Sequence, residues 1–175
     1  MATAKHFPGH GDTDSDSHLT LPIINHLRQR MDSIELYPFR ALISQGVMGV
    51  MIGHLYVPCY DSTKNTPATM SKTVVTLLLK DQLGFKGLAV TDALDMQGVT
   101  KFYKPGETEV KALQAGNDIL LLPQYADIAI RGIKTALDSG WLSYGLLEEK
   151  CRRILALKQE LGLTIKPVIR LENLI

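Results

Sequence analysis

The stretch KHFPGHGDTDSDSH, residues 5–18, begins within a short expected strand at 2–7 and becomes a polar loop at Pro8-Gly9. It holds three histidines, three aspartates, one lysine and two glycines. Such a segment offers little to a core, and polar, glycine-punctuated loops on a rigid scaffold carry function more often than packing. We therefore expect the segments on either side of this loop to form the fold, and the loop and the residues that contact it to carry the function.

The rest of the chain repeats one pattern, in which an apolar strand ends in a polar loop and a helix follows. Fully apolar strands that alternate with helices predict a parallel sheet covered on both faces. The expected strands are 2–7, 47–52, 87–91 and 118–122, and the expected helices are 35–46, 71–84, 105–116, 126–137 and 143–161.

The polar residues follow the carboxyl ends of these strands, as His54 and Asp92 show. In α/β barrels and in open α/β sheets alike, the active site lies at this edge. Four β/α units are half of the eight that close a barrel. We therefore expect residues 1–163 to form the C-terminal half of a barrel, and residues 164–175 to be a linker leading out of it.

Composition excludes several classes of function. The chain has 175 residues, of which 45% are hydrophobic and 21% charged, which is typical of a globular domain. The net charge of +1 and scattered basic residues give no reason to expect nucleic acid or an anionic membrane surface as a partner. No apolar run approaches the ~20 residues of a membrane span. Cys59 and Cys151 are expected to be ordinary thiols, and the cellular location, cytoplasm or periplasm, is not predicted.

The motif KHFPGHGDT at 5–13, with DSH at 16–18 and LP at 21–22, resembles the signature of β-N-acetylglucosaminidases of glycoside hydrolase family three. The resemblance covers almost the whole chain, because further family motifs follow in the same order. It implies a (β/α)₈ barrel of the TIM type, of which this chain would hold about the last four units. These further motifs are ELYPF at 35–39, MIGH at 51–54, PATMS at 67–71, LGFKG at 83–87, TDAL at 91–94 and AGND at 115–118.

The resemblance also implies the chemistry and the residues that perform it. The substrate would be an N-acetylglucosamine glycoside from peptidoglycan fragments or chitooligosaccharides, hydrolysed with retention of configuration and without a metal or other cofactor. Asp92 matches the nucleophile, His18 the general acid/base and Asp16 its partner. Lys5, His6 and His54 match positions that bind the sugar in the catalytic subsite.

These residue types suit that chemistry. Retaining hydrolysis needs a carboxylate on one face of the anomeric carbon and a proton donor on the other. Asp92 at a strand end could be a fixed nucleophile, and a cation such as Lys5 would help to keep it ionised; the alternative is an aspartate that caps the following turn. The usual proton donor is a carboxylic acid, but a histidine also titrates near neutral pH, and Asp16 could orient the ring of His18.

Lys5 and His6 raise a geometric condition. Neighbouring side chains on a regular strand point to opposite faces, so both can bind one sugar only if the strand ends or bulges there. Lys5 could otherwise be a solvated lysine.

A metal site is the competing interpretation of the histidines and aspartates, and it would make the protein a metal-dependent hydrolase. His6 and His10 lie across a Pro-Gly turn rather than on one helix face, and no cysteine joins them. We expect His10 and Asp12 instead to brace the loop by hydrogen bonds to its own backbone.

Two further alternatives stay open. The chain could be an incomplete, non-catalytic part of such an enzyme, and an open barrel edge would then favour self-association. The sequence also does not separate hydrolysis from transfer of the sugar to another acceptor such as phosphate.

Overall fold

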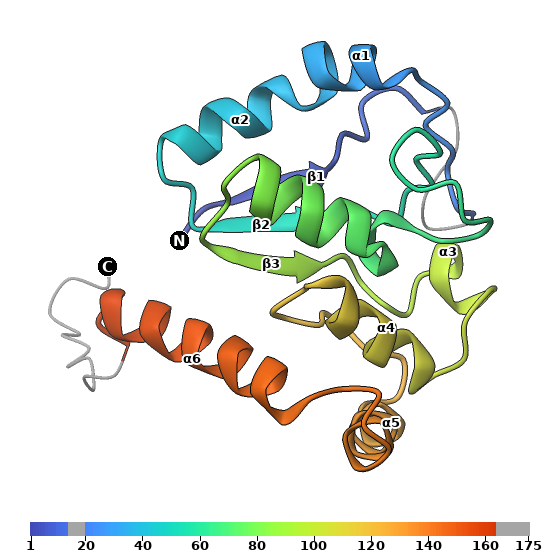
Figure 1. Ribbon diagram of the computed structural model, residues 1–175, viewed down its shortest axis with the longest axis vertical. Coiled ribbons are helices and arrows are strands. Elements are labelled where there is room, and N and C mark those ends of the chain that lie inside the picture. The colour runs from blue at the N-terminus through green and yellow to red at the C-terminus, as the bar shows by residue number, and fades with distance from the viewer. Residues whose placement is uncertain (14–19, 164–175) are drawn as a thin grey trace, which may run out of the picture.

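The computed structural model describes residues 1–13 and 20–163. At its centre lie three parallel strands in the order β1 (Thr3–Phe7), β2 (Gly49–Ile52) and β3 (Leu88–Thr91). The strands point the same way, and the loops that leave their carboxyl ends gather on one side of the molecule (Figure 1). The expected parallel sheet is confirmed for these three strands.

The helices follow the strands in the expected order, with short additions, one of them the turn η2 before the expected helix at 71–84. A short helix begins well before the expected start at residue 35, and another follows β3. Two helices have wide turns in which an amide bonds five residues back, as from Leu83 to Leu78 at 2.9 Å. The helices are α1 (Arg28–Arg30), η1 (Met31–Glu35), α2 (Tyr37–Ser44), η2 (Ala68–Met70), η3 (Thr73–Gln82), α3 (Gln97–Thr100), α4 (Glu107–Ala115), α5 (Ala126–Asp138) and α6 (Tyr144–Glu160).

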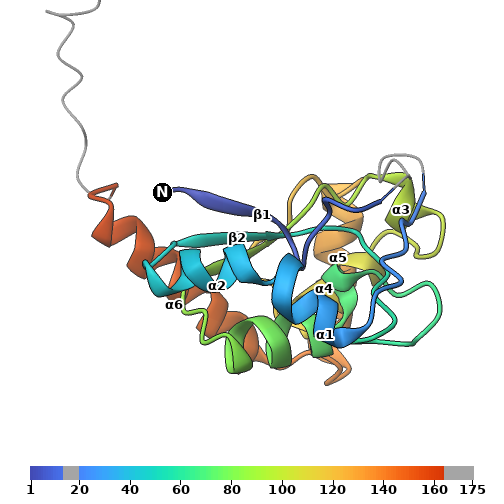
Figure 2. The same cartoon turned by 90° about the horizontal axis from the view of Figure 1, so that it is seen from above.

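The main core lies between the sheet and the helices α2 and η3, which pack on the same side of it (Figure 2). Phe7 of β1 meets Phe39 of α2 edge to face, with ring centroids 5.1 Å apart. Val50 of β2 and Leu79 of η3 are fully buried in the same cluster. Burying such side chains stabilises a fold by roughly 1.5–3 kcal/mol each, so this layer fixes the strands relative to the helices.

The expected fourth strand, residues 118–122, is only partly formed. It lies beside β3 and makes one parallel bridge, between Val90 and Ile119. Two residues further on, the amide of Leu121 bonds to the side-chain hydroxyl of Thr91 at 2.9 Å instead of to a backbone carbonyl. The side-chain acceptor interrupts the ladder, which is why an apolar run of strand length forms a bridge and not a strand.

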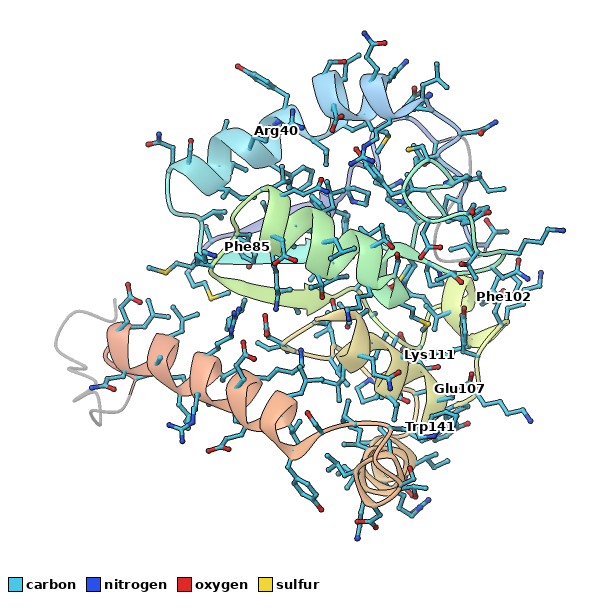
Figure 3. The ribbon with its side chains drawn as sticks, viewed as in Figure 1. Arg40, Phe85, Phe102, Glu107, Lys111 and Trp141 are labelled. Atoms are coloured by element: carbon cyan, nitrogen blue, oxygen red, sulfur yellow. The ribbon has the colours of Figure 1, made fainter. Side chains whose placement is uncertain are left out.

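The last helices form a second layer of packing. Val110 of α4 and Ala136 of α5 belong to a separate apolar cluster. The carboxylate of Glu109 accepts a hydrogen bond from the amide of Gly106 at 2.7 Å and caps the start of α4. Figure 3 shows Trp141 below the end of α4, where its carbonyl accepts a hydrogen bond from Gln114.

Strand and helix alternate, the strands are parallel, and α2 and η3 cover one face of the sheet, so the described residues form part of a TIM-barrel-type fold. No helix within 1–13 and 20–163 is both long and apolar enough to cross a membrane. The predicted limits of the half-barrel stay a prediction, and the expected linker at 164–175 lies outside the described residues.

Candidate active site

Asp92 directly follows β3, at the edge of the sheet where the carboxyl ends of the strands lie. Its amide donates to the carbonyl of Ile52 at 2.9 Å, which extends the pairing of β2 and β3 by one residue. The side chain therefore starts from a backbone that the sheet itself holds in place. This is where a TIM-type fold presents its reactive groups.

The two oxygens of the Asp92 carboxylate face different partners. Oδ1 accepts a hydrogen bond from the amide of Ala93 at 2.9 Å, and Oδ2 lies 3.6 Å from Nε2 of His6. The Asp92 side chain is 17% exposed and that of His6 is 27% exposed, so a ligand can reach both. A fixed, accessible carboxylate of this kind can act as a nucleophile.

A bulge in β1 brings Lys5 and His6 to the same pocket. Ala4 pairs with Val50 and Phe7 with Ile52, so β1 has one residue more than β2 over this interval. Bulges re-aim side chains and are frequent next to active sites. The strand therefore bulges where the sequence requires it to, if Lys5 and His6 are to reach the same sugar.

Lys5 and His6 line a pocket of about 530 Å³ together with residues of the loop after β1 and of α2. Within residues 1–13 and 20–163, the basic group found beside Asp92 is His6, with Nε2 3.6 Å from Oδ2, and the help of Lys5 in keeping Asp92 ionised stays a prediction. Lys5 is exposed and free to reach a ligand in the pocket.

His54 lies beneath the site and not at its surface. It is fully buried, and both ring nitrogens bond to the protein: Nδ1 lies 2.7 Å from Oγ1 of Thr69, and Nε2 lies 2.9 Å from the carbonyl of Ala93. Burial lowers its pKa, while the Ala93 carbonyl and Asp92 oppose this shift. The direct sugar contact implied by the resemblance stays a prediction, and the geometry gives His54 a role in holding the loop that carries Asp92.

In the described residues, the loop after β1 is braced by side chains, and the expected bonds of His10 and Asp12 to the loop's own backbone stay a prediction. His10 Nδ1 bonds to the hydroxyl of Thr13 at 2.9 Å. Asp12 Oδ2 lies 2.9 Å from Nε2 of His26 and 2.8 Å from the guanidinium of Arg30. The partners come from the segment before α1 and from α1, a region whose helix the sequence did not predict.

The same brace contains a set of atoms that could bind a metal. One ligand atom each from Asp12, His26 and Glu35 lie within 4.8 Å of one another. The guanidinium of Arg30 already contacts both carboxylates, at 2.8 Å to Asp12 and 3.2 Å to Glu35. The Arg30 guanidinium thus supplies the positive charge between these carboxylates, and a divalent ion would have to displace it. The predicted metal alternative used other histidines and gains no support here.

Asp16 and His18, the predicted acid/base pair, lie outside the described residues, and their roles stay predictions. Sequence reasoning missed Thr69 and Asn117, which stand behind His54. The amide of Asn117 donates to the carbonyl of Thr69 at 2.8 Å. Both residues belong to motifs that were noted, PATMS and AGND, but a motif without a charged or nucleophilic group gave no chemical reason to assign them a role.

Comparison with known proteins adds to this geometry. The sequence profile described as "Glycosyl hydrolase family 3 N terminal domain" matches residues 1–157. Among curated proteins, "Beta-hexosaminidase A" of Pseudoalteromonas piscicida is 36% identical, over 92% of this chain and 30% of its own length.

Solved structures agree with the fold in detail. A glycoside hydrolase family 3 β-N-acetylglucosaminidase from Paenibacillus sp. str. FPU-7 superposes with a TM-score of 0.92 and 40% identity, covering 98% of this chain and 33% of its own. "Beta-glucoside phosphorylase BglX" reaches a TM-score of 0.90 at 27% identity, covering 95% of this chain and 31% of its own. The chain therefore spans about a third of the length of the proteins it matches.

Proposed function

The chain belongs to glycosyl hydrolase family 3, and we propose that it carries the nucleophile side of a retaining β-N-acetylglucosaminidase site. Asp92 is the proposed nucleophile, with His6 and Lys5 as sugar-binding residues. The proposed substrate is a terminal β-linked N-acetylglucosamine of a peptidoglycan fragment or chitooligosaccharide. The likeness to proteins named β-hexosaminidase and β-N-acetylglucosaminidase supports this choice of sugar.

The proposed reaction has two steps. A carboxylate oxygen of Asp92 attacks the anomeric carbon, and the bond to the leaving oxygen breaks as that oxygen takes a proton from His18. Water then attacks the same carbon and gives its proton to His18, which releases the sugar and restores the Asp92 carboxylate. Asp16 would orient His18, as a carboxylate orients histidine in a catalytic triad.

The single observation that carries the proposal is the setting of Asp92. A half-exposed solvated aspartate would have no fixed direction, but this carboxylate is held by the Ala93 amide on one oxygen and faces His6 on the other. It also stands at the carboxyl end of β3, where TIM-type folds place reactive groups. The turn-capping alternative explains the Ala93 contact and leaves the approach of His6 unexplained.

The test is release of nitrophenol from p-nitrophenyl β-N-acetylglucosaminide. Replacing Asp92 by Asn keeps the shape and removes the charge, and should lower kcat by about 10³-fold or more. Asp127→Asn, an exposed aspartate on α5, is the matched control and should leave the rate unchanged. A small external anion such as azide should restore turnover in Asp92→Ala by attacking the anomeric carbon in place of the carboxylate. Near-normal turnover in Asp92→Asn would exclude the nucleophile role.

A second candidate function is transfer of the sugar to phosphate, which the likeness to a β-glucoside phosphorylase favours. A phosphate oxygen would then attack the anomeric carbon in the second step, displace Asp92 and leave as N-acetylglucosamine 1-phosphate. Product analysis with and without phosphate separates the two reactions. Free N-acetylglucosamine as the only product in excess phosphate would exclude transfer to phosphate and support hydrolysis.

A non-catalytic role is the remaining alternative. A folded wild-type chain that releases no nitrophenol would favour this role. Size-exclusion chromatography of the same sample would then test the predicted self-association through the open barrel edge.

A further inference from the structure

We propose that Thr69 is a positioning residue for the nucleophile: its hydroxyl fixes the His54 ring, which holds the Ala93 peptide that in turn holds the Asp92 carboxylate. This inference rests on the proposed function of Asp92. Thr69 belongs to η2 and contacts no reacting atom. It would act entirely through a line of hydrogen bonds.

The first step in the argument is the protonation of His54. Its Nε2 lies 2.9 Å from the carbonyl oxygen of Ala93, and a carbonyl can only accept. Nε2 therefore carries a hydrogen. Because burial lowers the pKa of His54, the ring is neutral near pH 7, and its other nitrogen must be an acceptor.

The second step is the donor to that acceptor. Nδ1 of His54 lies 2.7 Å from the hydroxyl of Thr69, a short and buried hydrogen bond. The Ala93 carbonyl sets this tautomer, and the Thr69 hydroxyl supports it by donating to the nitrogen that is left as an acceptor. Without it, a buried nitrogen would be left without a partner, which is the costly case for a polar group in a core.

The third step connects His54 to the carboxylate. Ala93 receives the His54 bond on its carbonyl and gives its amide to Asp92 Oδ1 at 2.9 Å. The residue that follows the nucleophile is therefore held at both polar groups. Enzymes lose large factors in rate from small misplacements of reacting groups, so fixing this residue bears directly on attack at the anomeric carbon.

The last step is what holds Thr69. The side-chain amide of Asn117, just after α4, donates to the carbonyls of Thr69 and Ala112, at 2.8 Å each. Both Thr69 and Asn117 are fully buried. The line of contacts therefore joins the segments that follow β2 and β3 and the end of α4, and it anchors the Asp92 loop to the core.

The activity test compares three variants of the chain. Thr69→Val removes the hydroxyl and keeps the shape, Thr69→Ser keeps the hydroxyl, and Thr108→Val removes another buried hydroxyl, which donates to the Lys104 carbonyl at 3.1 Å. We expect Thr69→Val to lower kcat about tenfold or more with KM within about twofold of the wild type. Thr69→Ser should recover most of this loss, and Thr108→Val should keep the wild-type kcat.

An NMR test does not depend on turnover. In protein labelled with ¹⁵N at its histidines, the ring-nitrogen chemical shifts of His54 should show the tautomer that carries its hydrogen on Nε2. The Ala93 amide should exchange with solvent about tenfold faster in Thr69→Val than in the wild type and in Thr108→Val.

The two tests separate the two proposals. A wild-type chain that releases no nitrophenol counts against the proposed function, while the NMR result still decides the inference. An active chain in which Thr69→Val and Thr108→Val have equal kcat, or in which Ala93 exchange is the same in both, overturns the role of Thr69. So does a His54 ring protonated on Nδ1 alone.

Discussion

Replacing Lys150 by Met should change how the stability of the protein depends on pH. Lys150 lies on α6 and is only 4% exposed, and its Nζ donates to the carbonyl of Asn117 at 2.7 Å. Burial lowers the pKa of Lys150 from its ordinary 10.5 to about 8; Asp118 opposes this shift and Lys80 adds to it. The charged form is thus disfavoured in the folded protein.

The direction of the pH dependence follows from whether the folded or the unfolded chain holds the Lys150 proton. Below pH 8 Lys150 is charged in both the folded and the unfolded chain, and burying the ammonium costs up to about 3 kcal/mol. Between pH 8 and pH 10.5 the unfolded chain keeps a proton that the folded chain has released. The free energy of unfolding therefore rises with pH across this window, by up to about 3 kcal/mol from this group.

The assay is urea unfolding of the wild type and of Lys150→Met at several pH values from about 7.5 to about 10.5. The difference in free energy of unfolding, wild type minus variant, should increase with pH. Taking the difference removes the contributions of Lys80, whose pKa burial also lowers, and of Tyr60, whose pKa burial raises. Lys158→Met, an exposed lysine on the same helix, is the matched control and should leave the slope unchanged.

Near pH 7 the two proteins should differ little. The variant loses a charged hydrogen bond worth about 1.5–3 kcal/mol and is relieved of a buried charge of similar cost. A wild-type-minus-variant difference that stays constant from pH 8 to pH 10.5 would show that the ammonium is not desolvated in the folded chain, and would refute the reasoning.

Two other substitutions test the structure around the site. Asp118→Asn removes a buried carboxylate that accepts from Lys80 at 3.0 Å on each oxygen, and leaves a partly buried lysine without this partner, so urea unfolding should show a loss of about 3 kcal/mol. A loss below about 1 kcal/mol would show that the pair is solvated. Gly9→Ala places a Cβ 2.7 Å from Cβ of Glu35, at a φ of +132°. Thermal unfolding of this variant should therefore show a lower melting temperature. Gly11→Ala is the control: no atom lies within 4 Å of its added Cβ, and it should unfold nearly as the wild type does.

The sequence predicted the three strands well: β2 and β3 lie in apolar runs that follow Gly46 and Gly87, and β1 ends at Pro8, a turn signal. It failed at residues 118–122 for a reason that composition does not encode. The hydroxyl of Thr91 takes the place of a backbone acceptor there. Whether a threonine side chain enters the ladder depends on the neighbouring strand, and not on the pattern of either segment alone.

The site was predictable to the extent that its chemistry resides in single side chains. Asp92 was predicted because it follows an apolar strand and matches a family motif, and His6 because it matches a family motif; the structure brings the two side chains together, and their roles stay predictions. His54 shows the limit: its ring partners stand 15 and 39 residues away, and nothing in the local sequence indicates that both nitrogens are engaged. The bulge at Lys5 and His6 was predictable only as a condition, because a bulge is defined by a pairing register.

The two sides of the site are held by forces of different strength. Asp92 is anchored through buried hydrogen bonds that run by way of His54 and Thr69 into the core. The loop after β1 is held through Asp12 and Arg30, whose side chains are 57% and 42% exposed, and exposed ion pairs contribute only about 0–1 kcal/mol. The proposed nucleophile would have to keep one position relative to the anomeric carbon, whereas groups on the loop could adjust to a bound sugar. The stiffness of the Asp92 side therefore comes from hydrogen bonds between segments that no single motif contains, and the exposed loop brace is the part that salt screening weakens.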